Sequence, residues 1–318
     1  MTKKIFSLTA SIIKVFIILS IFLSNSKADE NNIKYYSGEV GTLSIMYHRF
    51  NENKYPSTNI QMDVFKKQIE MIKEKKYQFE DPNLFDENFN NVKKEKKILI
   101  TIDDAFTSFY EHAWPYLKQN KIPFILFVST EAIGKNGYMN WEQLKEVEKE
   151  SFGYLGNHSH THEYLVDFSF DDFKKDINTS IKIFKKEIGY NPIFFSYPFG
   201  EYTDQQLKFI SGKFKYAFGQ HSGVIDQTKN KFELPRFPIN EKYGEIKRFK
   251  SLLKNIPFPY KKILPEEKYL ADKNNPPDVT IYFFENQKNL ENIGCYSNEQ
   301  NKWRKSKLLF TKKNIFLS

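Results

Sequence analysis

Two short stretches of the sequence place carboxylates and imidazoles beside strongly apolar segments. The first, TIDDAF at 101–106, sets Asp103 and Asp104 next to each other after the apolar run at 98–102. Neighbouring residues at the end of a strand point to opposite sides, so the two carboxylates can have different functions. An Asp–Asp pair also commonly ends a strand or caps a helix, and alone it indicates little.

The second stretch, GNHSHTH at 156–162, contains three histidines at alternating positions, namely His158, His160 and His162. Alternate residues of an extended backbone share a face, so His158 and His162 can reach one ion together with Asp104. One carboxylate and two imidazoles suit zinc or another borderline divalent metal and leave one coordination position open for water. Histidine clusters also occur on solvated loops, but the joint occurrence of both stretches after apolar runs favours a hydrolytic metal site.

Strand-like and helix-like patterns alternate through more than two hundred residues, which predicts an α/β fold with a parallel sheet or barrel. Catalytic groups of such barrels lie where strands end, as the two stretches do. Strands are expected at 40–47, 98–103, 124–128, 193–197, 216–219 and 232–239, and in the segment that carries the histidines. Helices are expected at 63–76, 108–119, 141–149 and 171–187.

The C-terminal part has a different composition. The segment ADKNNPPDV at 271–279 is typical of a linker, because its two adjacent prolines cannot continue a helix. Four short β-type runs follow at 279–284, 293–297, 307–310 and 315–318. We therefore expect one domain at 29–264, and at 265–318 a linker and a small β module that is either minimal or incomplete.

The N-terminus has the features of a secretory signal peptide at 1–28. Basic residues precede the short apolar core at 15–23, and Ser26-Lys27-Ala28 offers small residues at the −3 and −1 positions of a cleavage site. An uncleaved membrane anchor is the alternative, although Lys14 interrupts the apolar run and the remainder is short for a span. Export to the periplasm or the extracellular space is expected, with membrane contact only through an uncleaved signal.

Composition restricts the partners. The 318 residues include 48 Lys and Arg against 39 Asp and Glu, but no basic block is interleaved with aromatic residues, so nucleic acid is not an expected partner. Aromatic residues make up 17% of the chain, which suits a substantial core and a glycan-binding cleft. Cys295 is the only cysteine, so the fold cannot depend on an intrachain disulfide.

An ordered set of motifs resembles a known family. TIDDAF and HSHTH, followed by SYPFG at 196–200 and LPRF at 234–237, are similar to the NodB-homology polysaccharide deacetylases, carbohydrate esterase family 4. MYHRF at 46–50 resembles the branch of exported poly-N-acetylglucosamine deacetylases. The resemblance covers roughly residues 40–255 and implies a distorted (β/α) barrel. It also implies metal-dependent removal of acetyl groups from an N-acetylated extracytoplasmic polysaccharide that contains N-acetylglucosamine.

The resemblance assigns roles to individual residues. Asp103 matches the catalytic base, and Asp104, His158 and His162 match the metal ligands. Zinc is the expected ion, with cobalt, nickel or manganese as alternatives. His160 falls at a position that the family does not use for metal, so a structural role is expected.

Two positions depart from the family pattern. Ala105 stands where glycine is usual, which is a mild change unless the backbone needs a positive φ there. Ser196 stands where arginine often orients the base. We expect Arg236 to replace that arginine by pairing with Asp103 and keeping it ionised, the alternative being an ordinary surface ion pair. The Ser159 hydroxyl is expected to help hold the histidine loop.

The remaining catalytic groups are an oxyanion donor and a general acid. The family pattern places the oxyanion donor at the backbone N–H of Tyr197. His48, which follows an apolar strand, and His221, which lies between two glycines, compete as the general acid, and His48 is favoured. Two other functions stay open: a catalytically silent glycan-binding relative, and an amidase of the same fold that acts on a small non-sugar amide.

Overall fold

The computed structural model describes residues 41–90, 95–258, 260–268, 277–284, 290–299, 301–310 and 314–317. The predicted signal peptide at 1–28 lies outside the described residues, as do residues 271–276 of the predicted linker. Within the described ranges, no helix is long and apolar enough to cross a membrane.

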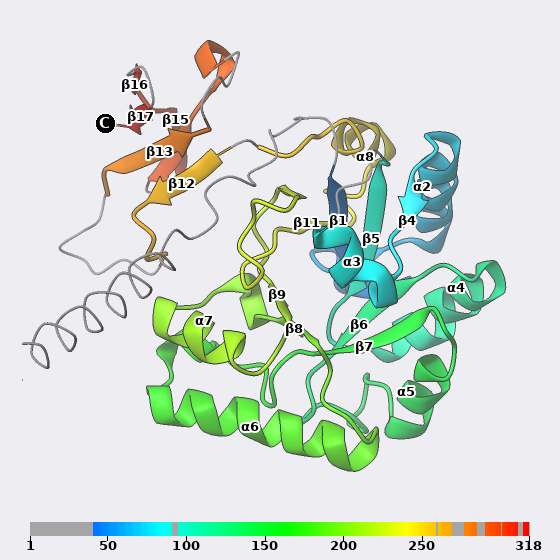
Figure 1. Cartoon of the computed structure of the whole chain (residues 1–318). Helices are drawn as coiled ribbons and strands as arrows, with labels where there is room; N and C mark the ends of the chain where they lie inside the picture. The colour runs from blue at the N-terminus through cyan, green and yellow to red at the C-terminus, as the bar shows by residue number, and fades with distance from the viewer. Residues whose placement is uncertain are drawn as a thin grey trace, which may run out of the picture. The chain divides into compact units, whose positions relative to one another are not determined.

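A nine-stranded sheet forms the centre of the main domain (Figure 1). Its strands are β1 (Thr42–Tyr47), β4 (Gln78–Phe79), β5 (Lys97–Ile102), β6 (Phe124–Val128), β7 (Gly153–Asn157), β8 (Phe194–Ser196), β9 (Tyr216–Phe218), β10 (Val224–Ile225) and β11 (Phe237–Pro238). The order is β10-β1-β5-β6-β7-β8-β9, with β11 paired to β1 and β4 paired to β5. All neighbours are parallel except β10, which is antiparallel to β1, so the predicted parallel α/β sheet is confirmed.

Helices connect the parallel strands, as parallel pairing requires. They are α2 (Met62–Glu74), α3 (Phe85–Asn90), α4 (Trp114–Asn120), α5 (Trp141–Glu148), α6 (Phe170–Glu187), α7 (Asp204–Ser211) and α8 (Ile246–Leu252). Short helical turns are η2 (Pro82–Leu84), η3 (Phe109–Ala113), η4 (Leu165–Asp167) and η5 (Pro198–Gly200), and β2 (Arg49–Phe50) pairs with β3 (Asn59–Ile60). The four predicted helices are present within a few residues of their expected bounds.

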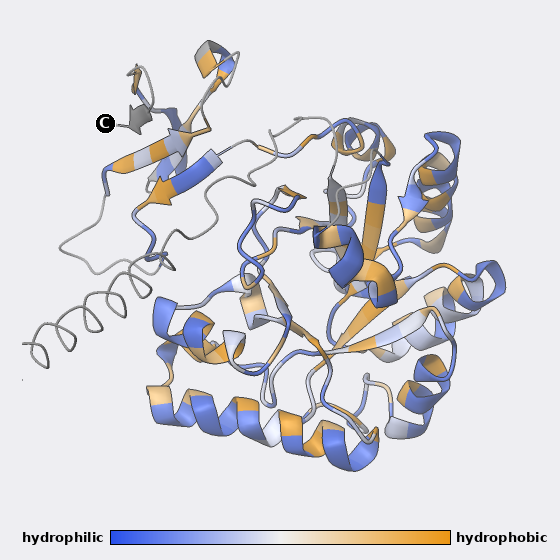
Figure 2. Ribbon diagram, viewed as in Figure 1, coloured by the Kyte–Doolittle hydropathy of each residue, from blue (hydrophilic) through white to orange (hydrophobic). Residues whose placement is uncertain are grey.

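Helix α6 shows why the sequence gives these elements. The Ser169 hydroxyl accepts a hydrogen bond from the Asp172 N–H and caps the first turn. Phe173, Ile177 and Phe184 recur at helical spacing, and all three are buried. The helix therefore covers the sheet with one apolar face, while hydrophilic residues occupy much of the rest (Figure 2).

Strand β5 is buried on both faces, which explains its uninterrupted apolar sequence. Ile98 and Ile100 pack in the cluster beneath the helices, whereas Leu99 packs in a separate cluster with Phe127 from β6. Residues at odd positions of β5 thus face this second cluster, and Asp103 continues their alternation at the end of the strand. The pleat alone therefore directs Asp103 to the inner side of the curled sheet.

A segment after β10 joins the two ends of the sheet. Leu234 is hydrogen-bonded at 2.9 and 3.0 Å to Ala217 and Gly219 beside β9, and β11 then pairs with β1. The curled sheet agrees with the distorted barrel that the sequence predicted. The sequence predicted one strand at 232–239, but only β11 is regular, because Pro235 interrupts the segment and has no N–H to donate.

The C-terminal residues form small antiparallel sheets. Strands β12 (Tyr260–Leu264), β13 (Val279–Phe283), β16 (Leu308–Phe310) and β17 (Asn314–Leu317) make one sheet in the order β12-β13-β17-β16. Strands β14 (Tyr296–Glu299) and β15 (Lys302–Lys305) form a hairpin, and η7 (Leu290–Asn292) precedes it. The predicted β character of this part is confirmed, but β12 belongs to its sheet although the sequence placed those residues in the preceding domain.

Candidate active site

The carboxyl ends of β5 and β7 bring the predicted metal ligands together. The Nε2 atom of His162 lies 3.1 Å from Oδ1 of Asp104, and the Nε2 atom of His158 lies 3.6 Å from the same oxygen. The three potential ligand atoms all lie within 4.8 Å of one another. Parallel strands end at the same edge of the sheet, so residues 58 positions apart in the chain become neighbours here.

The environment of His158 fits a divalent cation. Its Nδ1–H donates a 2.7 Å hydrogen bond to the carbonyl of Ser196, so Nε2 carries the free lone pair. This Nε2 is buried and has no hydrogen-bond partner among the described residues. Burial lowers the pKa of His158 to about 4, so the imidazole is neutral near pH 7. Nε2 therefore offers a buried lone pair beside a carboxylate. A metal ion coordinated by this nitrogen would supply the partner that it lacks.

The backbone after β5 turns sharply to place Asp104. Both Asp104 and Ala105 have positive φ angles, 76° and 53°. The glycine that is usual at the second position would adopt this conformation without steric cost, whereas alanine costs roughly 1 kcal/mol. The departure at Ala105 therefore is not a mild one, because the position does need a positive φ.

Hydrogen bonds fix the histidine loop. The Ser159 hydroxyl accepts a 3.1 Å bond from the His162 N–H, as the sequence predicted. The Nδ1 of His160 pairs with the Thr130 hydroxyl at 2.9 Å, which agrees with a structural role. Asp176 of α6 accepts bonds of 2.8 and 3.0 Å from the backbone N–H groups of His160 and Thr161. The sequence gave no role to Asp176, although its place on the buried face of α6 was a usable signal.

Asp103 stands beside the metal ligands and forms a bidentate ion pair with Arg236. The guanidinium donates to Oδ1 at 2.7 Å and to Oδ2 at 2.9 Å, and both side chains are completely buried. Burial raises the pKa of Asp103, but the charge and hydrogen bonds of Arg236 and the charges of His158 and His48 together hold that pKa below its usual value. Arg236 also donates to the Ser196 hydroxyl at 2.7 Å. The predicted pair is therefore present, and it is buried rather than a surface ion pair.

The two candidate general acids have different environments. His48 follows β1, and its buried Nδ1 has no hydrogen-bond partner within the described part of the chain. Burial raises the pKa of Asp104, but nearby imidazoles, His48 among them, outweigh this effect and lower the pKa. His221 is exposed, and its backbone carbonyl accepts a 2.9 Å bond from the Arg236 N–H. Partial burial lowers the pKa of His221 to about 4, whereas His48 is the one of the two that lowers the pKa of both Asp103 and Asp104.

Comparison with known families agrees with this geometry. Residues 90–216 match the polysaccharide deacetylase family, and the matched range contains Asp103, Asp104, His158 and His162. The chain carries a polysaccharide deacetylase domain. The family resemblance that the sequence motifs indicated is thereby confirmed.

Known bacterial proteins align with most of this deacetylase domain. A poly-β-1,6-N-acetyl-D-glucosamine N-deacetylase of Staphylococcus aureus is 25% identical over 252 residues, which cover 70% of this chain and 87% of that protein. A putative polysaccharide deacetylase of Bacillus subtilis is 26% identical over 200 residues, covering 62% of this chain and 70% of that protein.

Solved structures share the fold of the deacetylase domain. The Streptococcus pyogenes deacetylase PplD in complex with acetate has a TM-score of 0.62 at 22% identity, covering 68% of this chain and 100% of that chain. IcaB from Ammonifex degensii has a TM-score of 0.60 at 22% identity, covering 68% of this chain and 97% of that chain. These similarities establish the architecture of the domain.

The expected oxyanion donor requires a correction. The Tyr197 N–H donates a 3.0 Å hydrogen bond to the carbonyl of Phe218. This bond extends the pairing of β8 with β9, so the N–H does not point to the site as a free donor. Two residues later, Phe199 has a φ of 57°, and its ring lies 5.1 Å from that of His162. The Tyr197 N–H is therefore engaged within the sheet, and the Phe199 N–H is the alternative candidate for the oxyanion donor.

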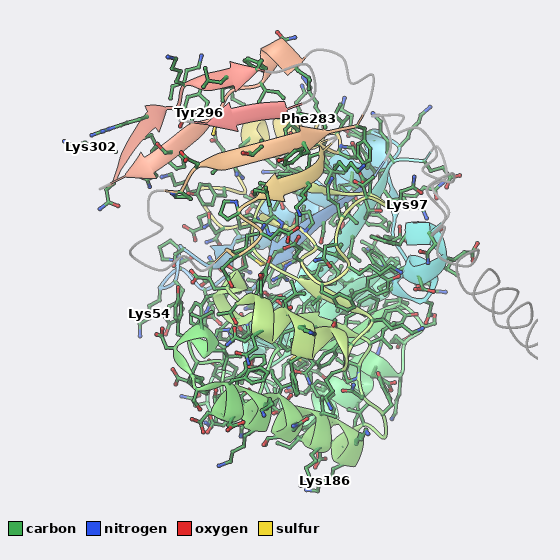
Figure 3. The ribbon with its side chains drawn as sticks, turned by 60° about the vertical axis from the view of Figure 1, so that its left-hand side comes forward. Lys54, Lys97, Lys186, Phe283, Tyr296 and Lys302 are labelled. Atoms are coloured by element: carbon green, nitrogen blue, oxygen red, sulfur yellow. The ribbon has the colours of Figure 1, made fainter. Side chains whose placement is uncertain are left out.

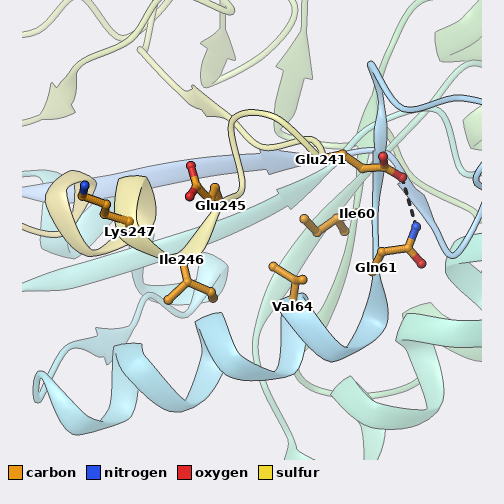
Figure 4. A pocket seen from close by; sticks show the side chains of 7 residues that line it. All are labelled: Ile60, Gln61, Val64, Glu241, Glu245, Ile246 and Lys247. Atoms are coloured by element: carbon orange, nitrogen blue, oxygen red, sulfur yellow. Dashed lines mark hydrogen bonds between the residues drawn. The ribbon is translucent and has the colours of Figure 1, made fainter.

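A cavity of about 350 Å³ lies apart from these residues, between α2 and the segment that leads into α8 (Figure 4). Its wall includes Ile60, Val64 and Ile246, and Gln61 donates a 3.0 Å hydrogen bond to Glu241 at its edge. None of the candidate catalytic or metal-ligating residues lines this cavity.

Proposed function

We propose that this protein is an exported, metal-dependent N-deacetylase of poly-β-1,6-N-acetylglucosamine. One observation carries the proposal: a buried carboxylate, Asp103, is held by Arg236 directly beside a separate Asp/His/His group. Its Oδ2 lies 3.8 Å from the unpartnered Nε2 of His158. A base next to a candidate metal site, but not part of it, is the arrangement that metal-assisted hydrolysis requires.

Two observations support the choice of substrate. The Staphylococcus aureus relative, which aligns with 70% of the chain, is named as an N-deacetylase of poly-β-1,6-N-acetylglucosamine. The MYHRF element at 46–50 resembles the same branch, and its histidine, His48, lowers the pKa of both aspartates, which supports a place for it near them. The predicted signal peptide supports export, since such a polymer is found outside the cell. The catalytic domain would end before β12, because this strand belongs to the C-terminal sheet, and the C-terminal sheets would form an accessory part.

Asp104, His158 and His162 would hold the metal. A divalent ion there, with zinc as the first choice, would polarise the acetyl carbonyl and lower the pKa of the attacking water. The neutral state of His158 and the low pKa of Asp104 keep both side chains in the form that ligates.

The chain's own groups would perform the proton transfers. Asp103 would take a proton from the attacking water as the oxygen bonds to the acetyl carbon. The Phe199 N–H would donate to the oxygen that gains negative charge. His48 would then give a proton to the sugar nitrogen as the C–N bond breaks, releasing acetate and a free amine.

The test is acetate release from β-1,6-linked N-acetylglucosamine oligomers by the metal-loaded protein, with Asp103→Asn as the main variant. This variant should bind metal in the same ratio as the wild type, because Asp103 is not a ligand, and should lose turnover by orders of magnitude. Elemental analysis and an acetate assay measure the two effects separately. An active Asp103→Asn protein would refute the assignment of the base, and a wild type that releases no acetate would refute the function.

A further inference from the structure

The hairpin of β14 and β15 exposes two large aromatic side chains. Trp303 is 73% exposed and Tyr296 is 59% exposed. The register pairs Asn298 with Trp303 and Tyr296 with Lys305, and alternate residues of a strand share a face, so these four side chains lie on one side of the hairpin. Tyr296 and Trp303 are therefore diagonal neighbours across the two strands. We call these four residues the Trp303 face.

Strand β15 borders the Trp303 face with positive charge. All residues of this strand, 302–305, are exposed, and Lys302 lies next to the turn of the hairpin, where Figure 3 labels it. Lys302 and Arg304 point to the opposite side from Trp303. The ribbon is only two strands wide, however, so the long stems of Lys and Arg can bring their charges to either side of it. The Trp303 face is thus an aromatic surface with cationic side chains around it.

The positive charge of the chain is concentrated at its two ends. Residues 296–318 contain six Lys and Arg residues but a single acidic residue, whereas residues 29–295 contain equal numbers of basic and acidic residues. The formal net charge of +9 therefore comes entirely from the predicted signal peptide and from this C-terminal stretch. The run KWRKSK at 302–307 is a short basic block that contains an aromatic residue, so the expectation that the chain has no such block is wrong.

The comparisons and the candidate active site leave this hairpin without a role. The family match ends at residue 216, and the whole of the PplD structure aligns with 68% of this chain. All candidate catalytic and metal-ligating residues precede β12, the first strand of the C-terminal sheets. An exposed aromatic surface with a local excess of positive charge therefore calls for a partner of its own.

We propose that the Trp303 face docks on the surface of a membrane that contains anionic phospholipids. Trp and Tyr rings have an apolar body and a polar N–H or O–H, and they favour the boundary between acyl chains and headgroups. Lys and Arg beside them would bind the headgroup phosphates. Leu309 follows Lys305 by four residues, which places it within about 14 Å along the chain, and its half-exposed side chain adds aliphatic surface.

The aliphatic and aromatic surface distinguishes a membrane from other anionic partners. A nucleic acid or a soluble acidic polymer would use the charge of the hairpin, but it would leave Leu309 in water. A bilayer uses both the charge and the apolar groups. This contact is independent of the predicted signal peptide, and it does not rest on the proposed function.

The test is co-sedimentation of the chain from residue 29 onward with lipid vesicles. This chain lacks the predicted signal peptide, whose apolar core would itself enter a bilayer, and it contains every residue that the structure describes. The wild type should bind vesicles of phosphatidylcholine and phosphatidylglycerol in about 0.1 M salt, and much less to vesicles of phosphatidylcholine alone. About 1 M salt should release it, because the screening length falls from about 10 Å to about 3 Å.

Two variants test the hairpin. Lys302→Gln/Lys305→Gln should lower the partition coefficient on anionic vesicles about 25-fold, or about fivefold for each charge removed. Trp303→Ala should lower it roughly tenfold, because the indole no longer leaves water. Lys182→Gln/Lys186→Gln is the matched control, since it removes the same charge from exposed positions of α6 and should change the partition coefficient at most about twofold. Circular dichroism should be unchanged in all variants.

The fluorescence of Trp303 gives a second measurement on the same vesicles. Trp303 is largely exposed whereas Trp114 is buried, so saturating anionic vesicles should shift the emission of the wild type to shorter wavelengths, and Trp303→Phe should lose this shift. Equal binding to neutral and anionic vesicles, hairpin variants that bind as well as the α6 control, or an unshifted emission would overturn the inference. Tighter binding to single-stranded DNA or to polyglutamate than to anionic vesicles would also overturn it, and would assign the face to a soluble polyanion.

Discussion

Replacing Arg236 by methionine should destabilise the deacetylase domain more than any other single change at the site. The substitution removes the two hydrogen bonds to Asp103 and leaves a fully buried carboxylate without its counter-ion. It also removes donors from the hydroxyls of Thr101 and Ser196 and from the carbonyl of Gly219. The side chains of Asp103 and Arg236 are both completely buried, so without Arg236 the desolvation cost of Asp103 is no longer offset.

Breaking a buried ion pair by removing one partner costs roughly 3–5 kcal/mol. Since a typical domain is stable by only about 5–15 kcal/mol, Arg236→Met should lose roughly a fifth or more of its free energy of unfolding. The Arg236→Met/Asp103→Asn double variant should recover about 1 kcal/mol or more of that loss, because it no longer buries an unpaired charge. A purely geometric role of Arg236 would predict no such recovery.

The measurement is denaturant unfolding near neutral pH, followed by circular dichroism, on metal-free protein. Metal is removed with a chelator because any ion bound to the native state would add stability by mass action. Arg248→Met is the control, since Arg248 is only partly buried and bonds a single carbonyl, that of Tyr243, and its loss should cost less than about 1 kcal/mol. An Arg236→Met protein as stable as this control, or a double variant no more stable than Arg236→Met, would refute the reasoning.

Three further predictions concern single residues. Asp104→Ala should retain its circular dichroism spectrum but lose stoichiometric metal, and an equimolar ion found by elemental analysis would contradict the ligand assignment. His48→Ala should lower the turnover of N-acetylglucosamine oligomers far more than His221→Ala, and the reverse order would exchange their roles. Burial raises the pKa of Glu80, so the folded state favours its protonated form, and wild type should lose stability relative to Glu80→Gln as pH rises from about 4 to about 8. Denaturant unfolding at several pH values tests this, and a constant difference would show that the pKa of Glu80 is not raised.

The parallel strands and the metal cluster could be predicted because local sequence determines them. The uninterrupted apolar run of β5 indicates burial on both faces, and a strand of that kind ends in Asp103 and Asp104 at the catalytic edge. The alternation of His158 and His162 is likewise a local pattern. Each of these inferences needed only the periodicity of a strand and the rule that parallel strands end together.

The residues that the sequence did not reveal depend on contacts between distant elements. Asp176 resembles an ordinary helical carboxylate, and only the docking of α6 brings it to the N–H groups of the histidine loop, although its spacing from Phe173 and Ser180 marks the buried face. The family pattern placed the oxyanion donor at Tyr197, because a motif does not show which N–H is used in strand pairing. The positive φ of Ala105 is a property of the turn and leaves no sign in the residue type.

The closure of the barrel has a consequence for the order in which the protein assembles. Asp103 leaves the ribosome 133 residues before Arg236, and its carboxylate has no cationic partner in β5 or β6. Until the segment after β10 docks, burial of the end of β5 would leave the Asp103 carboxylate without a counter-ion. This end should therefore stay hydrated while the neighbouring strands pair. The entropic cost of closing so long a loop grows only slowly with its length, but such distant contacts slow the search for the native state. A nascent chain that stops short of Arg236 should therefore have an open, protease-sensitive barrel, and the catalytic edge should form last.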